Sequence, residues 1–310
     1  MDYKQFIEEQ ISEIRDTVGR EKAINALSGG VDSSVVTVLG HRALGDQLKT
    51  VLVDNALMRE GEPEHVVKLF GKLGIKVSLI DAREEFLTAL AHLTDPEQKR
   101  QAITDTFYAK VFARLVKESG AKFLLHGTIL TDIEETVAGI KRQHNILAQI
   151  GIDTQKAYGY GVIEPLKSLR KDAVREVATA LKLPRELSQR IPFPGPALAA
   201  RIVGPVTKER LETVRAATTI VEEELSESGA FQYLAVLLSD LATGIRDNKR
   251  QFGEIVVIRC IDSVDARTAT VKELGWDKLN RICERIVQIK GVNRCLYDLT
   301  PKPPATVEYV

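Results

Sequence analysis

Short apolar runs alternate with segments of helical periodicity through the first half of the chain. The apolar runs predict buried strands at residues 23–27, 50–54, 76–81 and 123–126. Apolar residues spaced three or four apart predict helices at 3–18, 62–73 and from Pro96 to about residue 119. Strands that alternate with helices are typical of an α/β fold with a doubly wound parallel sheet. We expect this architecture in the first part of the chain.

A proline-rich segment then interrupts the pattern. Residues 191–196 read Ile-Pro-Phe-Pro-Gly-Pro, which ends any helix and makes a stiff linker. Beyond it the pattern predicts helices at 208–227 and 276–288, with strands at 254–259 and 294–298. We therefore predict two domains, a doubly wound domain at 1–190 and a smaller α+β domain at 191–310.

One octet, Leu-Ser-Gly-Gly-Val-Asp-Ser-Ser at residues 27–34, joins the first strand to a helix that we expect Ser33 to cap. Two glycines let the backbone approach an anion, and the free N–H groups of a helix start bind phosphate. Ser28, Ser33 and Ser34 add hydroxyl donors. A carboxylate faces a phosphate only across a divalent cation, so we interpret Asp32 as a magnesium ligand.

The plain alternative is an ordinary strand-to-helix turn, which explains the two glycines but poorly explains the whole octet. The octet also lacks the spacing of the P-loop and of the dinucleotide-binding glycine motif. Ser28, Asp54 and Gly127 all follow predicted parallel strands. Because ligands of such sheets bind at the carboxyl ends of the strands, this convergence supports a site there.

Composition limits the class of partner. The chain has 310 residues, and its 43 Lys plus Arg balance its 43 Asp plus Glu, so no basic field favours nucleic acid. No stretch is long and apolar enough to span a bilayer, and residues 1–6 have no apolar core of the kind that signal peptides need. Three cysteines form no disulfide framework, and five histidines show no metal spacing. We expect a cytoplasmic protein with reduced thiols and no membrane contact.

The octet resembles the pyrophosphate loop of the ATP pyrophosphatases (the PP-loop superfamily), which cleave ATP between its α and β phosphates. Further segments resemble signatures of the GMP synthetase family, and they follow that family's order along nearly the whole chain. These segments are 53–55 (Val-Asp-Asn), 94–97 (Thr-Asp-Pro-Glu), 127–129 (Gly-Thr-Ile), 164–166 (Glu-Pro-Leu), 192–196 (Pro-Phe-Pro-Gly-Pro) and 302–309. The chain is similar to the ATP pyrophosphatase part only, as in the archaeal enzyme made of two subunits.

The resemblance implies amination of xanthosine monophosphate (XMP) to GMP through an adenylated intermediate, with ATP and Mg²⁺, releasing AMP and pyrophosphate. It also implies a homodimer formed through the smaller domain. A glutaminase of this type needs a nucleophilic cysteine in its own domain. All three cysteines, Cys260, Cys283 and Cys295, lie in the smaller domain, where buried, inert thiols are the default. We therefore expect ammonia to come from a separate glutamine amidotransferase subunit.

The same resemblance implies the site residues. ATP contacts are expected from Ser28, Gly29, Gly30, Val31, Asp32, Ser33, Ser34, Val53, Asp54, Gly127 and Thr128. Catalytic roles are expected for Asp32, Asp132, Glu135, Lys141 and Lys171, with Asp32 as the metal ligand. The acceptor nucleotide is expected to meet Arg201, Lys302, Thr306 and Glu308, with Lys302 on its phosphate and Glu308 on its purine ring.

Plainer interpretations stand beside several of these roles. Asp132 and Glu135 hold magnesium or orient the reacting oxygen, or they only complement a helix dipole. Lys141 offsets charge on pyrophosphate or is a solubilising surface residue. Lys171 contacts phosphate, while its neighbours Asp172 and Arg175 are equally well explained as a surface pair. The prolines after Lys302 either fix that cation or only anchor the chain end.

The chain departs from the family pattern at Ile191, Ala197, Arg142, Gln143 and Arg267. The departures near the acceptor site leave room for a different acceptor, as in NAD synthetases or transfer RNA thiolases. The tail with Lys302 argues against the first, and the absence of both a Cys-x-x-Cys motif and a basic field argues against the second. From another class, a non-catalytic ATP-sensing module remains open, although Asp32 and Lys141 exceed what a sensor needs.

Overall fold

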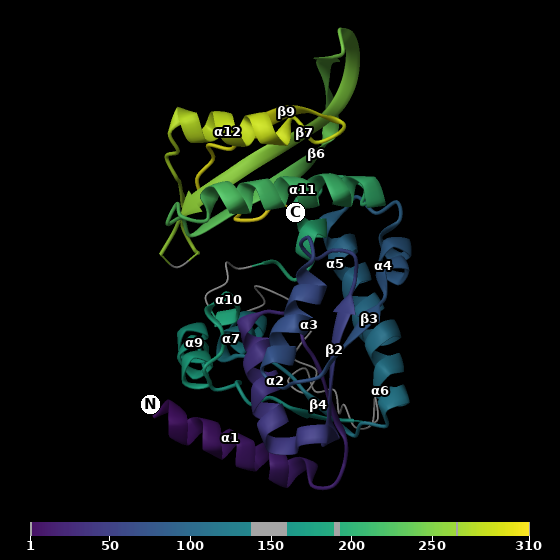
Figure 1. The fold of residues 1–310 in the computed structure, drawn as a ribbon, viewed down its shortest axis with the longest axis vertical. Coiled ribbons are helices and arrows are strands. Elements are labelled where there is room, and N and C mark those ends of the chain that lie inside the picture. The colour runs from purple at the N-terminus through teal and green to yellow at the C-terminus, as the bar shows by residue number, and fades with distance from the viewer. Residues whose placement is uncertain (1, 138–159, 189–192, 265, 310) are drawn as a thin grey trace. The chain divides into compact units, whose positions relative to one another are not determined.

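A computed structural model describes residues 2–137, 160–188, 193–264 and 266–309. The chain divides into two compact units (Figure 1). The first unit comprises Met1–Asp54, Pro63–Ala82 and Phe107–Arg190, and the second comprises Asn55–Glu62, Arg83–Thr106 and Ile191–Val310. Residues 55–62 and 83–106, which the sequence analysis assigns to the first domain, thus group with the second unit.

A five-stranded parallel sheet forms the centre of the first unit. Its strands are β1 (Ala23–Ala26), β2 (Leu48–Asp54), β3 (Val77–Asp81), β4 (Phe123–Leu125) and β5 (Gly161–Ile163), in the order β3-β2-β1-β4-β5. Ala23 of β1 pairs with Leu48 on one side and with Phe123 on the other. The chain reverses its direction of travel across the sheet between β1 and β4, which is where doubly wound folds bind ligands. The predicted doubly wound α/β fold is confirmed.

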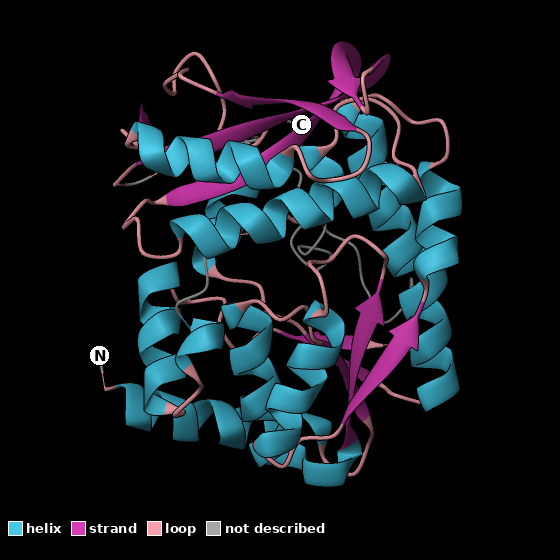
Figure 2. Cartoon of the chain, turned by 45° about the horizontal axis from the view of Figure 1, so that its top comes forward, coloured by secondary structure: helices cyan, strands magenta, loops and turns pink. Residues whose placement is uncertain are grey.

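Helices flank this sheet (Figure 2). They are α1 (Tyr3–Val18), α2 (Val31–Leu44), the short 3₁₀ turn η1 (Gly45–Gln47), α3 (Glu62–Lys72), α6 (Ala113–Ser119), α7 (Leu130–Val137), α9 (Lys171–Ala180) and α10 (Arg185–Ser188). α1 begins where the Asp2 side chain accepts hydrogen bonds from the backbone N–H groups of Lys4 and Gln5. Its apolar face is buried, and α1, α2 and α9 pack against one another.

The second unit contains a four-stranded sheet. β6 (Gln232–Arg246) and β7 (Lys249–Asp262) form a long antiparallel hairpin, while β8 (Thr270–Val271) and β9 (Val292–Tyr297) pair with β7. Asp247 and Asn248 turn the hairpin with φ of 48° and 58°, as tight two-residue turns require. Buried Leu234, Val236 and Val257 form part of the core.

The helices of the second unit are α4 (Arg83–Leu90), α5 (Pro96–Asp105), the 3₁₀ helix η3 (Ala197–Arg201), α11 (Lys208–Leu225) and α12 (Trp276–Ile286). The predicted α+β character is confirmed, but the sequence analysis omits α4 and β6. A π-helical segment, η2 (Thr106–Phe112), joins α5 to α6 in place of one uninterrupted helix. None of the helices that the structure describes is long and apolar enough to cross a membrane.

Candidate active site

The loop after β1 has an irregular backbone that leads directly into α2. Gly29 has φ of 79°, a left-handed conformation that favours glycine. Gly30 is the N-cap, and no side chain of the described residues caps the helix start. The expectation that Ser33 caps this helix is wrong, because the helix begins earlier, at Val31. The first N–H groups of α2 therefore keep the capacity to bind an anion.

Hydroxyl groups brace this loop from within. Ser33 Oγ accepts a hydrogen bond from Ser28 N at 3.2 Å and donates one to Gly30 O at 3.0 Å. The Ser28 and Ser33 hydroxyls lie 2.9 Å apart. Ser34 Oγ is buried and has no hydrogen-bond partner among the described residues. The loop shape is thus fixed by its own serines.

Gly127, directly after β4, packs against the start of α2. A Cβ atom at this position would lie 3.3 Å from Ser33 N and 3.4 Å from the carbonyl carbon of Asp32. A larger residue would therefore push the two loops apart. The structure brings together the loops after β1 and β4 at the point where the strand order reverses, as the sequence analysis predicts.

A chain of hydrogen bonds fixes the segment after Gly127. Thr128 Oγ1 donates to Glu164 Oε1 at 2.5 Å and lies 3.0 Å from His126 Nδ1. Burial lowers the pKa of His126 to about 4, so its ring is neutral near pH 7. A neutral ring with Nδ1 protonated completes the chain from His126 through Thr128 to Glu164. These side chains orient the backbone of a segment that we expect to contact ATP.

Asp32 and Lys171, which lie 139 residues apart in sequence, form an ion pair through Asp32 Oδ2. The side chains are 25 % and 45 % exposed, so both remain accessible to a ligand. Asp32 Oδ1 is buried and has no hydrogen-bond partner among the described residues. A carboxylate oxygen in this state fits a divalent cation, because hard oxygen donors are what Mg²⁺ prefers.

The other predicted residues of the first unit have the following surroundings. Val53 is buried in β2, and the carbonyl of Asp54 accepts a hydrogen bond from Ala82 N. Asp132 Oδ2 accepts from Ile129 N at 3.0 Å, the contact of a residue that caps its own helix. Glu135 belongs to α7. Lys141, together with Arg142 and Gln143, lies outside the described residues.

In the second unit, the structure brings Arg201 and Glu308 together. The Arg201 side chain is only 1 % exposed, and its Nε and Nη2 atoms donate to the Glu308 carboxylate at 3.3 and 3.2 Å. Gln232 Nε2 donates to the same carboxylate at 2.8 Å. Arg201 Nη1 is buried without a hydrogen-bond partner among the described residues. One donor of a buried guanidinium is therefore available for a ligand.

The two remaining predicted tail residues have partners within the second unit. Lys302 Nζ donates to the carbonyl of Ala266 at 2.7 Å, and its backbone pairs with Ala269 in an isolated bridge. Thr306 Oγ1 donates to the carbonyl of Glu308. All four predicted acceptor-site residues thus belong to one polar region of the second unit or to the tail attached to it.

A departure from the family pattern has a structural consequence at Ala197. This residue has φ of 53°, where a side chain is strained by about 1–2 kcal/mol and glycine is not. The glycine of the family pattern is therefore explained by the backbone alone. Ala197 opens η3, the helix that ends at Arg201. Ile191, another departure, lies outside the described residues.

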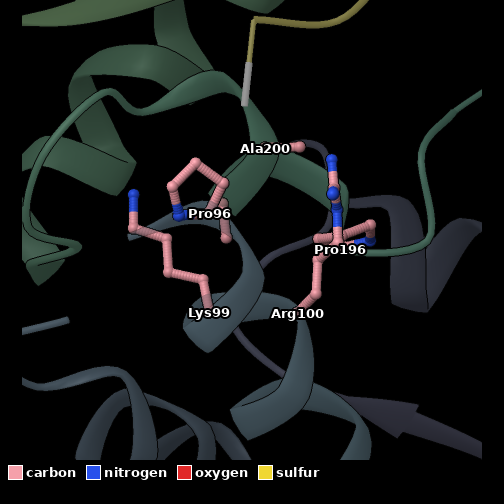
Figure 3. A pocket seen from close by; sticks show the side chains of 6 residues that line it. Pro96, Lys99, Arg100, Pro196 and Ala200 are labelled. Atoms are coloured by element: carbon pink, nitrogen blue, oxygen red, sulfur yellow. The ribbon is translucent and has the colours of Figure 1, made fainter. Parts of the chain in front are cut away.

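A small depression lies beside η3 (Figure 3). Pro96, Lys99 and Arg100 of α5 line one side, and Pro196, Ala199 and Ala200 line the other. Its empty space is about 140 Å³, whereas ligand pockets measure roughly 300–1,000 Å³. Lys99 Nζ donates to the Ile202 carbonyl at 2.7 Å. The depression is too small to hold a nucleotide by itself.

Sequence reasoning missed several residues that organise these regions: His126, Glu164, Gln232 and Arg259. Arg259 interrupts an apolar run that continues with Cys260 and Ile261. A charged residue in a buried run is almost always paired, so this position carried a usable signal. Nothing in the spacing of the other three indicates their partners.

Comparisons with known proteins decide the family. A family model described as the GMP synthase C-terminal domain matches residues 219–309, and one described as NAD synthase matches residues 2–195. The ATP pyrophosphatase subunit of glutamine-hydrolyzing GMP synthase from Archaeoglobus fulgidus is 50 % identical over 310 residues, 100 % of both chains. The chain belongs to this family of GMP synthase subunits. The corresponding subunits from Methanothermobacter thermautotrophicus and Pyrococcus horikoshii are 48 % and 44 % identical over 98 % and 100 % of both chains. The predicted resemblance to GMP synthetases is confirmed.

Proposed function

We propose that this GMP synthase family member uses ATP and ammonia to convert XMP into GMP, AMP and pyrophosphate. The observation that carries the proposal is the full-length match to GMP synthase subunits, which spans both the phosphate-loop sheet and the GMP synthase C-terminal model. In the proposed reaction the C2 oxygen of XMP attacks the α-phosphorus of ATP and displaces pyrophosphate. Ammonia then attacks C2, AMP leaves with the former C2 oxygen, and a proton is released.

The first unit supplies the ATP site in this proposal. The uncapped N–H groups at the start of α2 and the serine hydroxyls bind phosphate, while Gly127 and Thr128 border the nucleotide. Lys171 offsets charge that grows on the pyrophosphate. Lys141 shares this role, and Asp132 and Glu135 orient the reacting oxygen or the metal. Val53 and Asp54 contact the nucleotide from the end of β2.

Asp32 is the residue that would hold Mg²⁺, because its Oδ1 atom is buried without a partner among the described residues. When bound there, the cation would neutralise the phosphates of ATP and of departing pyrophosphate. Lys171 already pairs with the other carboxylate oxygen, so the two cations would share one side chain.

Arg201, Lys302, Thr306 and Glu308 form the acceptor-nucleotide site in this proposal. Glu308 presents a carboxylate held in place by two donors, which suits the N–H edge of a purine. The Arg201 Nη1 donor suits an oxygen of the same base or of a phosphate. Lys302 meets the phosphate of XMP as a point charge.

Ammonia is proposed to come from a separate glutamine amidotransferase subunit. The relatives are named as one subunit of a glutamine-hydrolyzing enzyme. Burial raises the pKa of the Cys260 thiol to about 11 and that of the Cys295 thiol to about 12. Thiols in this state are poor nucleophiles near pH 7. Their reduced state and the use of ATP support a cytoplasmic location.

A lysine-to-alanine change at Lys302 tests the acceptor site. We expect the KM for XMP to rise by about 10- to 100-fold, because one charge-assisted phosphate contact contributes roughly 1.5–3 kcal/mol. The KM for ATP should stay within about twofold, since the contact does not involve ATP. Paired substrate titrations measure both values.

The Lys272→Ala variant is the matched control, because Lys272 pairs with Asp262 in the same unit and lies outside the tail. If Lys302 only anchors the chain end through Ala266, its variant should instead lose thermal stability with both KM values unchanged. An unchanged KM for XMP would thus remove Lys302 from the acceptor site.

We also propose that the chain forms a homodimer through the β6–β7 hairpin. Leu241, Ile245 and Phe252 are 58 %, 76 % and 76 % exposed. Phe252 pairs with Thr243, which lies between Leu241 and Ile245 on the same face of the hairpin. A contiguous exposed apolar face of this kind marks a protein interface.

The Phe252→Asp variant tests this dimer. Wild-type protein should sediment at twice the monomer mass at micromolar concentration, and the variant should shift toward the monomer because a charge on an apolar interface is costly to desolvate. Lys249→Asp, an exposed change on the same hairpin outside the apolar face, is the control. A wild-type chain that sediments as a monomer at every concentration would contradict the proposal.

A second candidate acceptor belongs in the same assay, because a model described as NAD synthase matches residues 2–195. Pyrophosphate release should be measured with ATP, Mg²⁺ and ammonium, and with XMP, deamido-NAD or no acceptor. We expect release with XMP alone. Release with deamido-NAD would favour the second candidate, and ATP binding with no release under any condition would favour an ATP-sensing module.

A further inference from the structure

The C-terminal tail has few backbone hydrogen bonds of its own. Beyond β9, residues 298–309 include three prolines, which donate no backbone hydrogen bond. The backbone of the tail bonds from Asp298 to Ile258, between Lys302 and Ala269, and in a turn between Ala305 and Pro301. A segment with so few such contacts depends on side chains for its position.

One buried arginine supplies most of them. Arg259 of β7 is 0 % exposed, and its guanidinium donates to the carbonyls of Thr300, Thr306 and Val307 at 2.8, 2.9 and 3.2 Å. It also donates to Asp298 Oδ2 at 2.7 Å. Four hydrogen bonds from one rigid fork therefore hold both ends of the segment 300–307.

Asp298 links this guanidinium to the end of the chain. Its Oδ1 accepts from Thr300 N at 2.8 Å, and its Oδ2 accepts from the Tyr309 hydroxyl at 2.9 Å. Burial by itself would raise the pKa of Asp298, but hydrogen bonds from Thr300 and Tyr309 and the charge of Arg259 lower it below its usual range. The carboxylate is therefore ionised near pH 7 and pairs with Arg259 as a full charge.

The predicted acceptor residues lie within or next to the closed segment. Lys302 and Thr306 fall between the carbonyls that Arg259 holds, and Glu308 directly follows Val307. We infer that Arg259 is a positioning residue for the acceptor nucleotide: it closes residues 300–307 into a fixed loop and so sets where Lys302 and Glu308 meet XMP. This inference rests on the proposed acceptor site, since Arg259 itself is buried beneath the tail.

The Arg259→Lys variant tests the inference. Lysine keeps a charge opposite Asp298 but cannot bridge carbonyls several residues apart with a planar fork. We expect the KM for XMP to rise about 10- to 100-fold, since two or more hydrogen bonds that order the tail are lost, with the KM for ATP within about twofold. Amide hydrogen exchange of a peptide covering residues 299–309 should become at least about tenfold faster in the protein without substrate.

Arg246→Lys is the matched control. Arg246 likewise donates to three carbonyls of the second unit, those of Val287, Ile289 and Val292, and its bonds do not reach the tail. It should lower the melting temperature by a similar amount while leaving both KM values and the exchange of the tail unchanged. A role of Arg259 in stability alone would make the two variants behave alike.

The exchange measurement needs no turnover, so it separates this inference from the proposed function. If wild-type protein does not aminate XMP, the proposed function fails, whereas unchanged tail exchange in folded Arg259→Lys overturns the positioning role. Faster exchange with an unchanged KM for XMP also overturns it. If Arg259→Lys does not fold, the isosteric Asp298→Asn takes its place, with an expected rise of about threefold or more in the KM for XMP.

Discussion

Replacing Asp32 by asparagine is expected to remove most magnesium-dependent turnover while the protein stays folded. The change is isosteric and removes the charge that we propose holds the metal. Metal stabilisation of departing pyrophosphate is worth several kcal/mol, so kcat should fall by about 10²- to 10³-fold at saturating Mg²⁺. Titration of Mn²⁺, followed by its electron spin resonance signal, should show weaker cation binding in the presence of a non-hydrolysable ATP analogue.

The fold should tolerate this change because Asp32 and Lys171 are both partly exposed. Exposed or half-exposed ion pairs contribute only about 0–1 kcal/mol, so the melting temperature should fall by a few degrees at most. Asp172→Asn is the matched control, since Asp172 is the exposed neighbour of Lys171 in the first turn of α9. Near-normal turnover of Asp32→Asn would remove this carboxylate from the mechanism.

The purified chain is expected to make GMP with ammonium and not with glutamine. Hydrolysis of glutamine needs an activated cysteine, and burial raises the pKa of the Cys260 and Cys295 thiols to about 11 and 12. At equal concentrations of ammonium and glutamine, the rate with glutamine should therefore reflect only the ammonia that contaminates it. Addition of a glutamine amidotransferase subunit should restore the glutamine-driven rate.

A triple Cys→Ser variant is the control for this assay. It should keep the ammonium-driven rate, because no cysteine is placed in the site. GMP formation from glutamine by the isolated chain, lost in the triple variant, would contradict the proposal and assign a glutaminase to one of these thiols.

The first sheet was predictable because most of its strands are short buried runs of the kind that parallel sheets require. Their parallel pairing also follows from the alternation with helices. β6 was harder to predict: its first half is buried on both faces and its second half is exposed, so it has no single period. α4 has only eight residues, too few for helical spacing to stand out.

The candidate site was predictable as a set of loops but not as a set of contacts. The glycines and serines of residues 28–34 indicate phosphate chemistry because few other patterns need them together. The pairing of Asp32 with Lys171 could not be predicted, since nothing in a sequence links residues so far apart without the fold. The helix start was misplaced for a related reason: Ser33 resembles a cap, yet its hydroxyl braces the preceding turn.

Labelled oxygen tests the central claim most directly. XMP carrying ¹⁸O at C2 should be incubated with the chain, ATP, Mg²⁺ and ammonium, and the products analysed by mass spectrometry. If the C2 oxygen is adenylated and then displaced by ammonia, one ¹⁸O atom should appear in each AMP and none in pyrophosphate. Label in pyrophosphate or in water, or GMP formed without labelled AMP, would contradict the proposed reaction.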